Sequence, residues 1–143
     1  MEVLVREVSR QDAREVMLLS QQLGYDISLP EINANIETLL KDDDNKVFVA
    51  EHNNNVIGWI GAALVLTIQS LPFCEIRGLV VDEKFRKNNI GKLLLEKAIK
   101  WSKEKGCKKL RVRCNVKRKD THAFYMHLGF TEKKEQKIFE INV

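Results

Sequence analysis

Apolar residues recur along the chain with two periods, which together predict alternating strands and helices. Two-residue alternation and short β-branched runs predict strands, whereas a three- to four-residue spacing predicts amphipathic helices. The predicted strands are residues 3–8, 47–51, 56–66, 74–81, 110–114, 130–131 and 136–141, and the predicted helices are residues 9–23, 30–40, 90–105 and 120–128. The element order β-α-α-β-β-β-α-β-α-β-β predicts an α/β (α+β) fold, a mixed and mostly antiparallel sheet with flanking helices.

Length and composition predict a single domain over residues 1–143, because no repeat, linker or shift in composition divides the chain. Apolar residues make up 44 % and charged residues 31 %, as in ordinary globular proteins. No apolar run has the length of a membrane span, and the first residues lack the apolar stretch of a signal peptide. Three cysteines without metal-ligand spacing suit a reducing compartment, so we expect a cytoplasmic protein that binds no metal.

The segment between strand 74–81 and helix 90–105 has the features of a phosphate-binding loop. An apolar run leads into a basic turn, and the first turn of the helix that follows has unpaired N–H groups and the positive end of the helix dipole. Lysine and arginine side chains add charge, and Asn88 or Asn89 is expected to cap the helix. The run is Leu79, Val80 and Val81, and the loop is Arg86, Lys87, Asn88, Asn89, Ile90, Gly91 and Lys92. An ordinary surface turn explains this segment equally well.

The loop resembles the acetyl-CoA loop of the GCN5-related N-acetyltransferase (GNAT) family, whose motif is Arg/Gln-x-x-Gly-x-Gly/Ala. Here Asn89 replaces the first glycine and Gly91 matches the second. The strand before the loop and the segment 120–130, with its Phe-Tyr-x-x-x-Gly-Phe pattern, resemble the same family, so the resemblance covers nearly the whole chain. It implies a GNAT fold splayed between its fourth and fifth strands, with acetyl-CoA held there by Leu79, Val80, Val81, the loop Arg86–Lys92 and Asn115.

The resemblance also implies a reaction, the transfer of acetyl from acetyl-CoA to a primary amine by direct attack in a ternary complex. Tyr125 occupies the family's position for protonating the leaving thiolate, although it could instead pack with its aromatic neighbours and only hydrogen-bond the sulfur. Glu75 is the predicted base, with Arg77 on the same strand face; a plain salt bridge is the alternative. His122 is a further candidate base, or a surface residue of its helix.

Acidic and basic residues are unevenly distributed along the chain, and their distribution indicates which molecules each part of the chain would bind. Residues 1–83 contain 14 acidic and 6 basic residues, whereas residues 84–119 contain 2 acidic and 15 basic ones. The basic block suits the phosphates of CoA better than nucleic acid, because interleaved aromatics and nucleic-acid-binding motifs are missing. The acidic part suits a small cationic amine near Tyr25, Asp26 and Glu31.

Three alternatives remain open at this point. The chain could be a non-catalytic acyl-CoA sensor, its acceptor could be a protein or peptide amine, and it could form a homodimer. The dimer would pair through the C-terminal segment from Ile138 to Val143, which has the composition of an edge strand.

Overall fold

The computed structural model describes residues 1–143 as two compact units, Met1–Val112 and Arg113–Val143. The first unit contains β1 (Leu4–Glu7), α1 (Ala13–Gln22), α2 (Leu29–Leu40), β2 (Asn45–His52), β3 (Asn55–Val65), β4 (Phe73–Val81), α3 (Ile90–Glu104), β5 (Leu110–Val112) and two short 3₁₀ helices, Arg10–Asp12 and Glu83–Phe85. The second unit contains α4 (Lys119–His127). None of these helices combines the length and the apolar character needed to cross a membrane.

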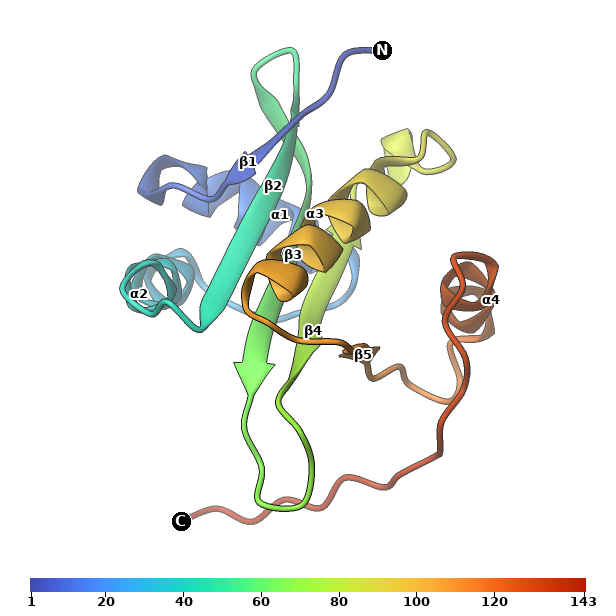
Figure 1. Cartoon of the computed structure of the whole chain (residues 1–143). Helices are drawn as coiled ribbons and strands as arrows, with labels where there is room; N and C mark the ends of the chain where they lie inside the picture. The colour runs from blue at the N-terminus through green and yellow to red at the C-terminus, as the bar shows by residue number, and fades with distance from the viewer. The chain divides into compact units, whose positions relative to one another are not determined.

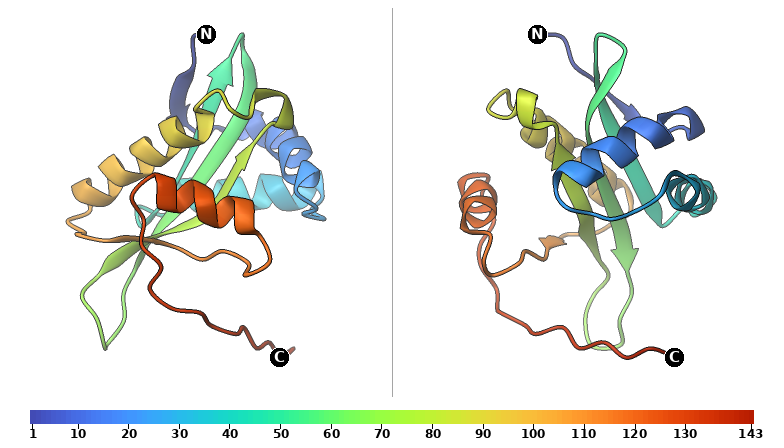
Figure 2. Two further views of the ribbon diagram at one scale, coloured as in Figure 1. Left: turned by 90° about the vertical axis from the view of Figure 1, so that its right-hand side faces the viewer. Right: turned by 180° about the vertical axis from the view of Figure 1, so that it is seen from behind.

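The first unit is built on a five-stranded sheet whose strands lie side by side in chain order (Figure 1). β1 to β4 are antiparallel, and β5 alone runs parallel to its neighbour, β4. Helix α3 covers one face of the sheet, and α1 and α2 cover the other (Figures 1 and 2). The predicted mixed, mostly antiparallel sheet with flanking helices is therefore confirmed.

Side chains alternate between the two faces of the sheet and so form two layers of core. A side chain at Gly58 of β3 would contact Leu94 and Ile90 of α3, which places this position on the α3 face. Trp59, the next residue, packs instead on the cluster formed with α1 and α2, and its indole nitrogen donates to the Ser20 hydroxyl of α1 at 3.3 Å. Odd-numbered β3 residues from Trp59 to Ala63 therefore face α1 and α2.

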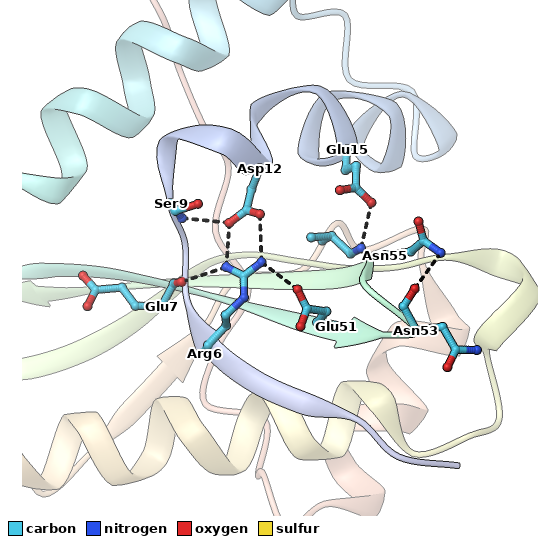
Figure 3. A network of polar contacts seen from close by, with 9 residues as sticks. Arg6, Glu7, Ser9, Asp12, Glu15, Glu51, Asn53 and Asn55 are labelled. Atoms are coloured by element: carbon cyan, nitrogen blue, oxygen red, sulfur yellow. Dashed lines mark hydrogen bonds and ion pairs between the residues drawn. The ribbon is translucent and has the colours of Figure 1, made fainter.

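A polar network ties the start of the chain to the β2–β3 hairpin (Figure 3). Arg6 donates two hydrogen bonds to the carboxylate of Asp12, at 2.8 and 2.9 Å, and a third to Glu51 of β2 at 3.1 Å. Burial by itself would raise the pKa of Asp12, but the hydrogen bonds from Arg6 and Ser9 and the positive charge of Arg6 lower it. Glu15 of α1 accepts from the backbone N–H of Val56 at 2.7 Å. The network thus joins β1 and α1 to β2 and β3.

The predicted C-terminal hairpin, 130–131 with 136–141, is absent, because residues 128–143 form neither helix nor strand. The alternation of Phe139, Ile141 and Val143 with polar residues favours a strand, but the sheet contains only β1 to β5 and no strand pairs with this segment. Ile138 and Phe139 are both more than four-fifths exposed, and so is Ile141. The predicted homodimer through this segment stays a prediction.

Candidate active site

The loop that follows β4 places the backbone for binding a phosphate. Val80 of β4 and Ile90 of α3 are each 1 % exposed and anchor the two ends of the loop in the core. Between them, Lys87 and Asn89 adopt left-handed backbone, at φ +70° and +63°. Glycine and asparagine reach this conformation most readily. The left-handed turn therefore explains how Asn89 can occupy the position of the glycine that the family motif contains.

The N-terminus of α3 presents uncompensated positive charge to its surroundings. Asn89 is the N-cap residue, but its side chain makes no capping hydrogen bond, and the first turn contains no acidic residue. Asn88 does not cap either, since its amide donates to the carbonyls of Phe85 and Arg86 within the loop. Asn89 thus occupies the expected N-cap position, but neither asparagine side chain caps the helix. The N–H groups of this first turn are therefore uncapped, with Arg86, Lys87 and Lys92 exposed around them.

Next to this loop, one edge of β4 is open for pairing. β4 pairs with β3 along its whole length, but with β5 only from Cys74 to Ile76. From Arg77 to Val81 no strand pairs with the other edge, so a bound molecule can make strand-like hydrogen bonds to this backbone. The edge begins beside the loop that leads to α3 and ends next to Glu75, and the structure thereby brings the predicted cofactor residues Leu79, Val80 and Val81 together with Arg86–Lys92.

A β-bulge shapes the other end of that edge. Gly61 of β3 is paired with Gly78, whereas the next β3 residue, Ala62, is paired with Ile76, so Arg77 is the extra residue. A methyl group on Gly61 would lie 3.9 Å from Cβ of Arg77 and 3.7 Å from the Trp59 ring, which places Arg77 on the α1/α2 face. Gly78 lies against the same ring, because a side chain there would come within 2.5 Å of it.

Glu75 lies on the α1/α2 face as well, opposite Ala63 of β3. Its side chain is almost fully buried, and Arg77 Nη1 donates to its Oε1 at 2.6 Å. A buried carboxylate held at the point where β4 and β5 separate is a suitable proton acceptor for a group bound there. The ion pair that the sequence predicted as the alternative is therefore present, and a role for Glu75 as the base remains a prediction.

Two neighbouring groups escaped the sequence-based analysis. Arg111 of β5 is the cross-strand neighbour of Glu75, and its guanidinium stacks 4.0 Å from the centre of the Phe73 ring. The second group is Trp59, whose ring packs against Gly78. The basic alternation Leu110-Arg111-Val112-Arg113 was a visible signal, but only the register of β5 on β4 shows which face Arg111 occupies.

In the second unit, Tyr125 of α4 is buried, with the rings of Phe124 and Phe130 in edge contact at 5.1 and 5.2 Å. Burial raises the pKa of its hydroxyl far above the usual value, and the nearby Cys114 contributes. The hydroxyl therefore stays protonated at neutral pH and is a hydrogen-bond donor.

The remaining candidates of this unit are Asn115, which precedes α4, and His122, which lies within it. Asn115 is exposed, and its side-chain oxygen accepts from the N–H of Lys117 at 2.9 Å. His122 Nε2 lies 2.8 Å from the carbonyl oxygen of Asn115. His122 thus already has a structural partner, which favours the surface role over that of a base.

The predicted acceptor residues lie along the connection between α1 and α2. Tyr25 and Asp26 are exposed loop residues. Glu31 stands in the first turn of α2, where its carboxylate accepts from the N–H of Ser28 at 3.0 Å and the Ser28 hydroxyl accepts from Glu31 N–H at 3.3 Å. These hydrogen bonds lower the pKa of Glu31. Its carboxylate is a capping group in this structure, and its predicted role in acceptor binding is untested.

Sequence relatives point to one family. The model of the acetyltransferase (GNAT) family matches residues 11–130. An uncharacterised N-acetyltransferase of Methanocaldococcus jannaschii is 33 % identical over 98 residues, which are 67 % of this chain but 43 % of that protein, so the match spans less than half of that relative. An aminoalkylphosphonate N-acetyltransferase of Salmonella typhimurium is 28 % identical over 116 residues, or 80 % of this chain and 73 % of that protein.

Solved structures agree on the fold. The aminoglycoside N-acetyltransferase AAC(6')-Iy in complex with CoA has a TM-score of 0.89 at 20 % identity, covering 99 % of this chain and 96 % of the other. The glucosamine-6-phosphate N-acetyltransferase of Arabidopsis thaliana has a TM-score of 0.86 at 21 % identity, covering 99 % and 100 %. The solved structures share the fold, and the family match over residues 11–130 shows the membership: the chain belongs to the acetyltransferase (GNAT) family.

Proposed function

We propose that this chain transfers the acetyl group of acetyl-CoA to the nitrogen of a small primary amine, by direct attack in a ternary complex. The observation that carries the proposal is the open edge of β4, which runs from the basic loop before α3 to the buried Glu75. The names of its relatives and structural neighbours describe enzymes for aminoglycosides, aminoalkylphosphonates and glucosamine 6-phosphate, all of them small amines, and this supports a small acceptor rather than a protein amine.

Acetyl-CoA supplies an activated thioester, and the residues of this chain match its parts. The uncapped first turn of α3, with Arg86, Lys87 and Lys92, would hold the pyrophosphate. The open edge of β4 from Arg77 to Val81 is four residue steps long, about 13 Å at ~3.3 Å per residue. That length suits an extended pantetheine arm whose amides pair with the backbone of Leu79 to Val81. The thioester would then lie near Arg77, where β5 begins to pair with β4.

The acceptor must lose a proton before it attacks. An alkylammonium has a pKa near 10.4, so most of it is protonated at neutral pH. In our proposal Glu75 accepts this proton, directly or through a water molecule, and Arg77 keeps the carboxylate in place. The amine nitrogen then attacks the thioester carbonyl, and backbone N–H groups on the open edge of β4 stabilise the oxyanion that forms. When this intermediate collapses, the C–S bond breaks, and the second proton of the nitrogen passes to the departing sulfur, directly or through water.

Departure of the CoA sulfur involves Tyr125 in this proposal. A thiol has a pKa near 8.5, far below that of the buried tyrosine, so full proton transfer from Tyr125 to the thiolate is uphill. We therefore assign Tyr125 a hydrogen bond to the developing thiolate, which stabilises the negative charge without ionising the phenol. The raised pKa of the Tyr125 hydroxyl is the reason for proposing a hydrogen-bond donor here and not a general acid.

The acceptor is expected to approach on the α1/α2 face, where Glu75 lies. Tyr25 and Asp26, exposed on the loop between these helices, are proposed to contact the amine-bearing end of the molecule. Glu31 is proposed to contribute charge while it caps α2, since one carboxylate can accept several hydrogen bonds.

The test is the release of free thiol from acetyl-CoA in the presence of aminoglycosides, aminoalkylphosphonates, polyamines, amino acids and short peptides. The proposal expects release with at least one class of small amine and an N-acetylated product. Saturable acetyl-CoA binding without release would identify an acyl-CoA sensor instead, and release with peptides alone would identify a protein or peptide acceptor. Absence of acetyl-CoA binding would overturn the assignment of the loop before α3.

A further inference from the structure

The face of β4 and β5 that bears Glu75 also bears two arginines. Arg77 lies on this face because a side chain on Gly61 would meet its Cβ. Arg111 lies there because it is the register partner of Glu75 on the adjacent parallel strand, and partners across a sheet share a face. Two guanidinium groups therefore lie on the same face as the carboxylate beside which the acceptor nitrogen is proposed to react.

One contact with the protein fixes each of the two guanidinium groups. Arg77 donates through Nη1 to Glu75, and its side chain is 56 % exposed. Arg111 is fixed by stacking on the buried ring of Phe73, which orients the plane of a guanidinium without using its donors. No protein acceptor takes the remaining N–H groups of Arg77 or any of those of Arg111. An arginine has five donors, so each still offers at least two for a ligand.

The chemistry of such a pair is selective. Planar guanidinium groups bind oxyanions through two parallel hydrogen bonds and repel cations. We propose that the acceptor carries an oxyanion group, a phosphonate, phosphate or carboxylate, which Arg77 and Arg111 bind while Glu75 receives the amine. This inference rests on the proposed function and narrows its substrate class to short amphoteric amines.

Sheet geometry sets the length of the acceptor. Neighbouring strands are about 4.8 Å apart, and residues two apart on one strand are separated by about 6.7 Å. The base of Glu75 therefore lies about 5 Å from that of Arg111 and about 7 Å from that of Arg77, and the two arginines are about 8 Å apart on the diagonal. An amine and an oxyanion joined by two or three carbon atoms match this spacing, whereas a polycation would bring further ammonium groups against the two arginines.

The experiment compares acceptors that differ in one end of a short chain. Wild-type protein is assayed by thiol release with 2-aminoethylphosphonate, phosphoethanolamine and β-alanine as the three oxyanion types, with propylamine as the neutral counterpart and with 1,3-diaminopropane as the cationic one. The inference expects kcat/KM for at least one oxyanion acceptor to exceed that for propylamine by about tenfold to a hundredfold, the value of a hydrogen-bonded charge pair. Equal or better use of propylamine or of the diamine would overturn it.

Variants separate the anion site from general damage to the fold. Arg111→Gln is expected to raise KM for the preferred oxyanion acceptor about tenfold or more and to lower kcat/KM for that acceptor at least tenfold more than for propylamine. Arg111→Lys should restore only part of the affinity, because an ammonium lacks the two-pronged geometry. Arg14→Gln, which removes an exposed arginine from α1, is the matched control. Equal losses for both acceptors in Arg111→Gln would contradict the inference.

A binding measurement distinguishes failure of this inference from failure of the proposed function. Methylphosphonate carries the oxyanion without an amine, so calorimetric titration of wild type and Arg111→Gln with it needs no turnover. Binding that depends on Arg111 in a protein that acetylates no amine would retain the anion site and overturn the proposed reaction. Turnover of amines without Arg111-dependent binding of methylphosphonate would overturn the anion site alone.

Discussion

Replacing Glu75 by glutamine tests the proposed proton acceptor with little change of shape. The amide keeps an oxygen that can accept from Arg77 Nη1, now 2.6 Å from the carboxylate, but it is neither charged nor basic. Loss of a general base lowers rates by about 10²- to 10⁴-fold. We therefore expect kcat/KM for thiol release at neutral pH to fall in that range, with KM for acetyl-CoA unchanged.

Glu75→Gln should lower the stability of the fold only slightly, so a large loss of activity would report on catalysis and not on folding. Removing one partner of a fully buried ion pair costs about 3–5 kcal/mol. Arg77, however, has a side chain that is 56 % exposed, so water can solvate its freed charge. We expect the free energy of unfolding, measured in urea, to fall by only about 1 kcal/mol. Glu104→Gln, an exposed carboxylate on α3, is the matched control and should change neither quantity.

The pH dependence of the variant provides the sharper readout. Without a base, the variant must rely on amine that is already unprotonated, and this fraction rises tenfold per pH unit below the amine pKa of about 10.4. The deficit of Glu75→Gln relative to wild type should therefore shrink as the pH rises. A value of kcat/KM within about threefold of wild type at neutral pH, below the smallest contribution expected of a base, would refute the assignment and leave Glu75 as a structural partner of Arg77.

Three further predictions concern the loop, the leaving group and the N-terminal network. Asn89→Gly should leave KM for acetyl-CoA within about threefold of wild type, whereas Asn89→Val, a β-branched residue at φ +63°, should destabilise the loop by about 1–2 kcal/mol and raise that KM; equal KM values for both would contradict the strain argument. Tyr125→Phe should lower kcat by about tenfold, the value of one charged hydrogen bond. Because the pKa of Tyr125 is raised, the wild-type rate should not fall as the pH rises to 10. A decline of the wild-type rate in this range that is absent from Tyr125→Phe would contradict this. Asp12→Asn should lower the free energy of unfolding at pH 7 by about 1–3 kcal/mol. Since the pKa of Asp12 is lowered by folding, its contribution is complete above an unfolded value of about 3.9 and is lost as the pH falls from there through the lower folded pKa, so wild type and variant should converge in acid melts.

Elements whose pattern is local were predictable from the sequence. The strand–loop–helix segment ending in α3 and the helix bearing Tyr125 lie where the sequence indicated, because apolar spacing, basic loop residues and helix ends act over a few positions. The capping role of Glu31 was equally readable from the spacing Ser28-x-x-Glu31, although its acidity suggested an acceptor residue.

Features that depend on register were not predictable. The bulge at Arg77 arises from the pairing of β3 with β4, and the position of Arg111 beside Glu75 requires the alignment of β5, whose partner is remote in the sequence. The C-terminal hairpin was predicted from the local alternation of apolar residues, which does not show whether a partner strand is present. The two unpredicted features and the wrong hairpin have one physical cause, since strand pairing is set by non-local contacts.

The central claim is that an acetyl group passes from CoA to a small amine, and mass spectrometry tests it most directly. Wild-type protein is incubated with acetyl-CoA carrying an isotope-labelled acetyl group and with each amine of the panel. The account predicts one labelled acetyl on the acceptor nitrogen for every thiol released. Labelled acetate with an unmodified amine, or labelled acetyl-CoA recovered intact with every amine, would contradict it.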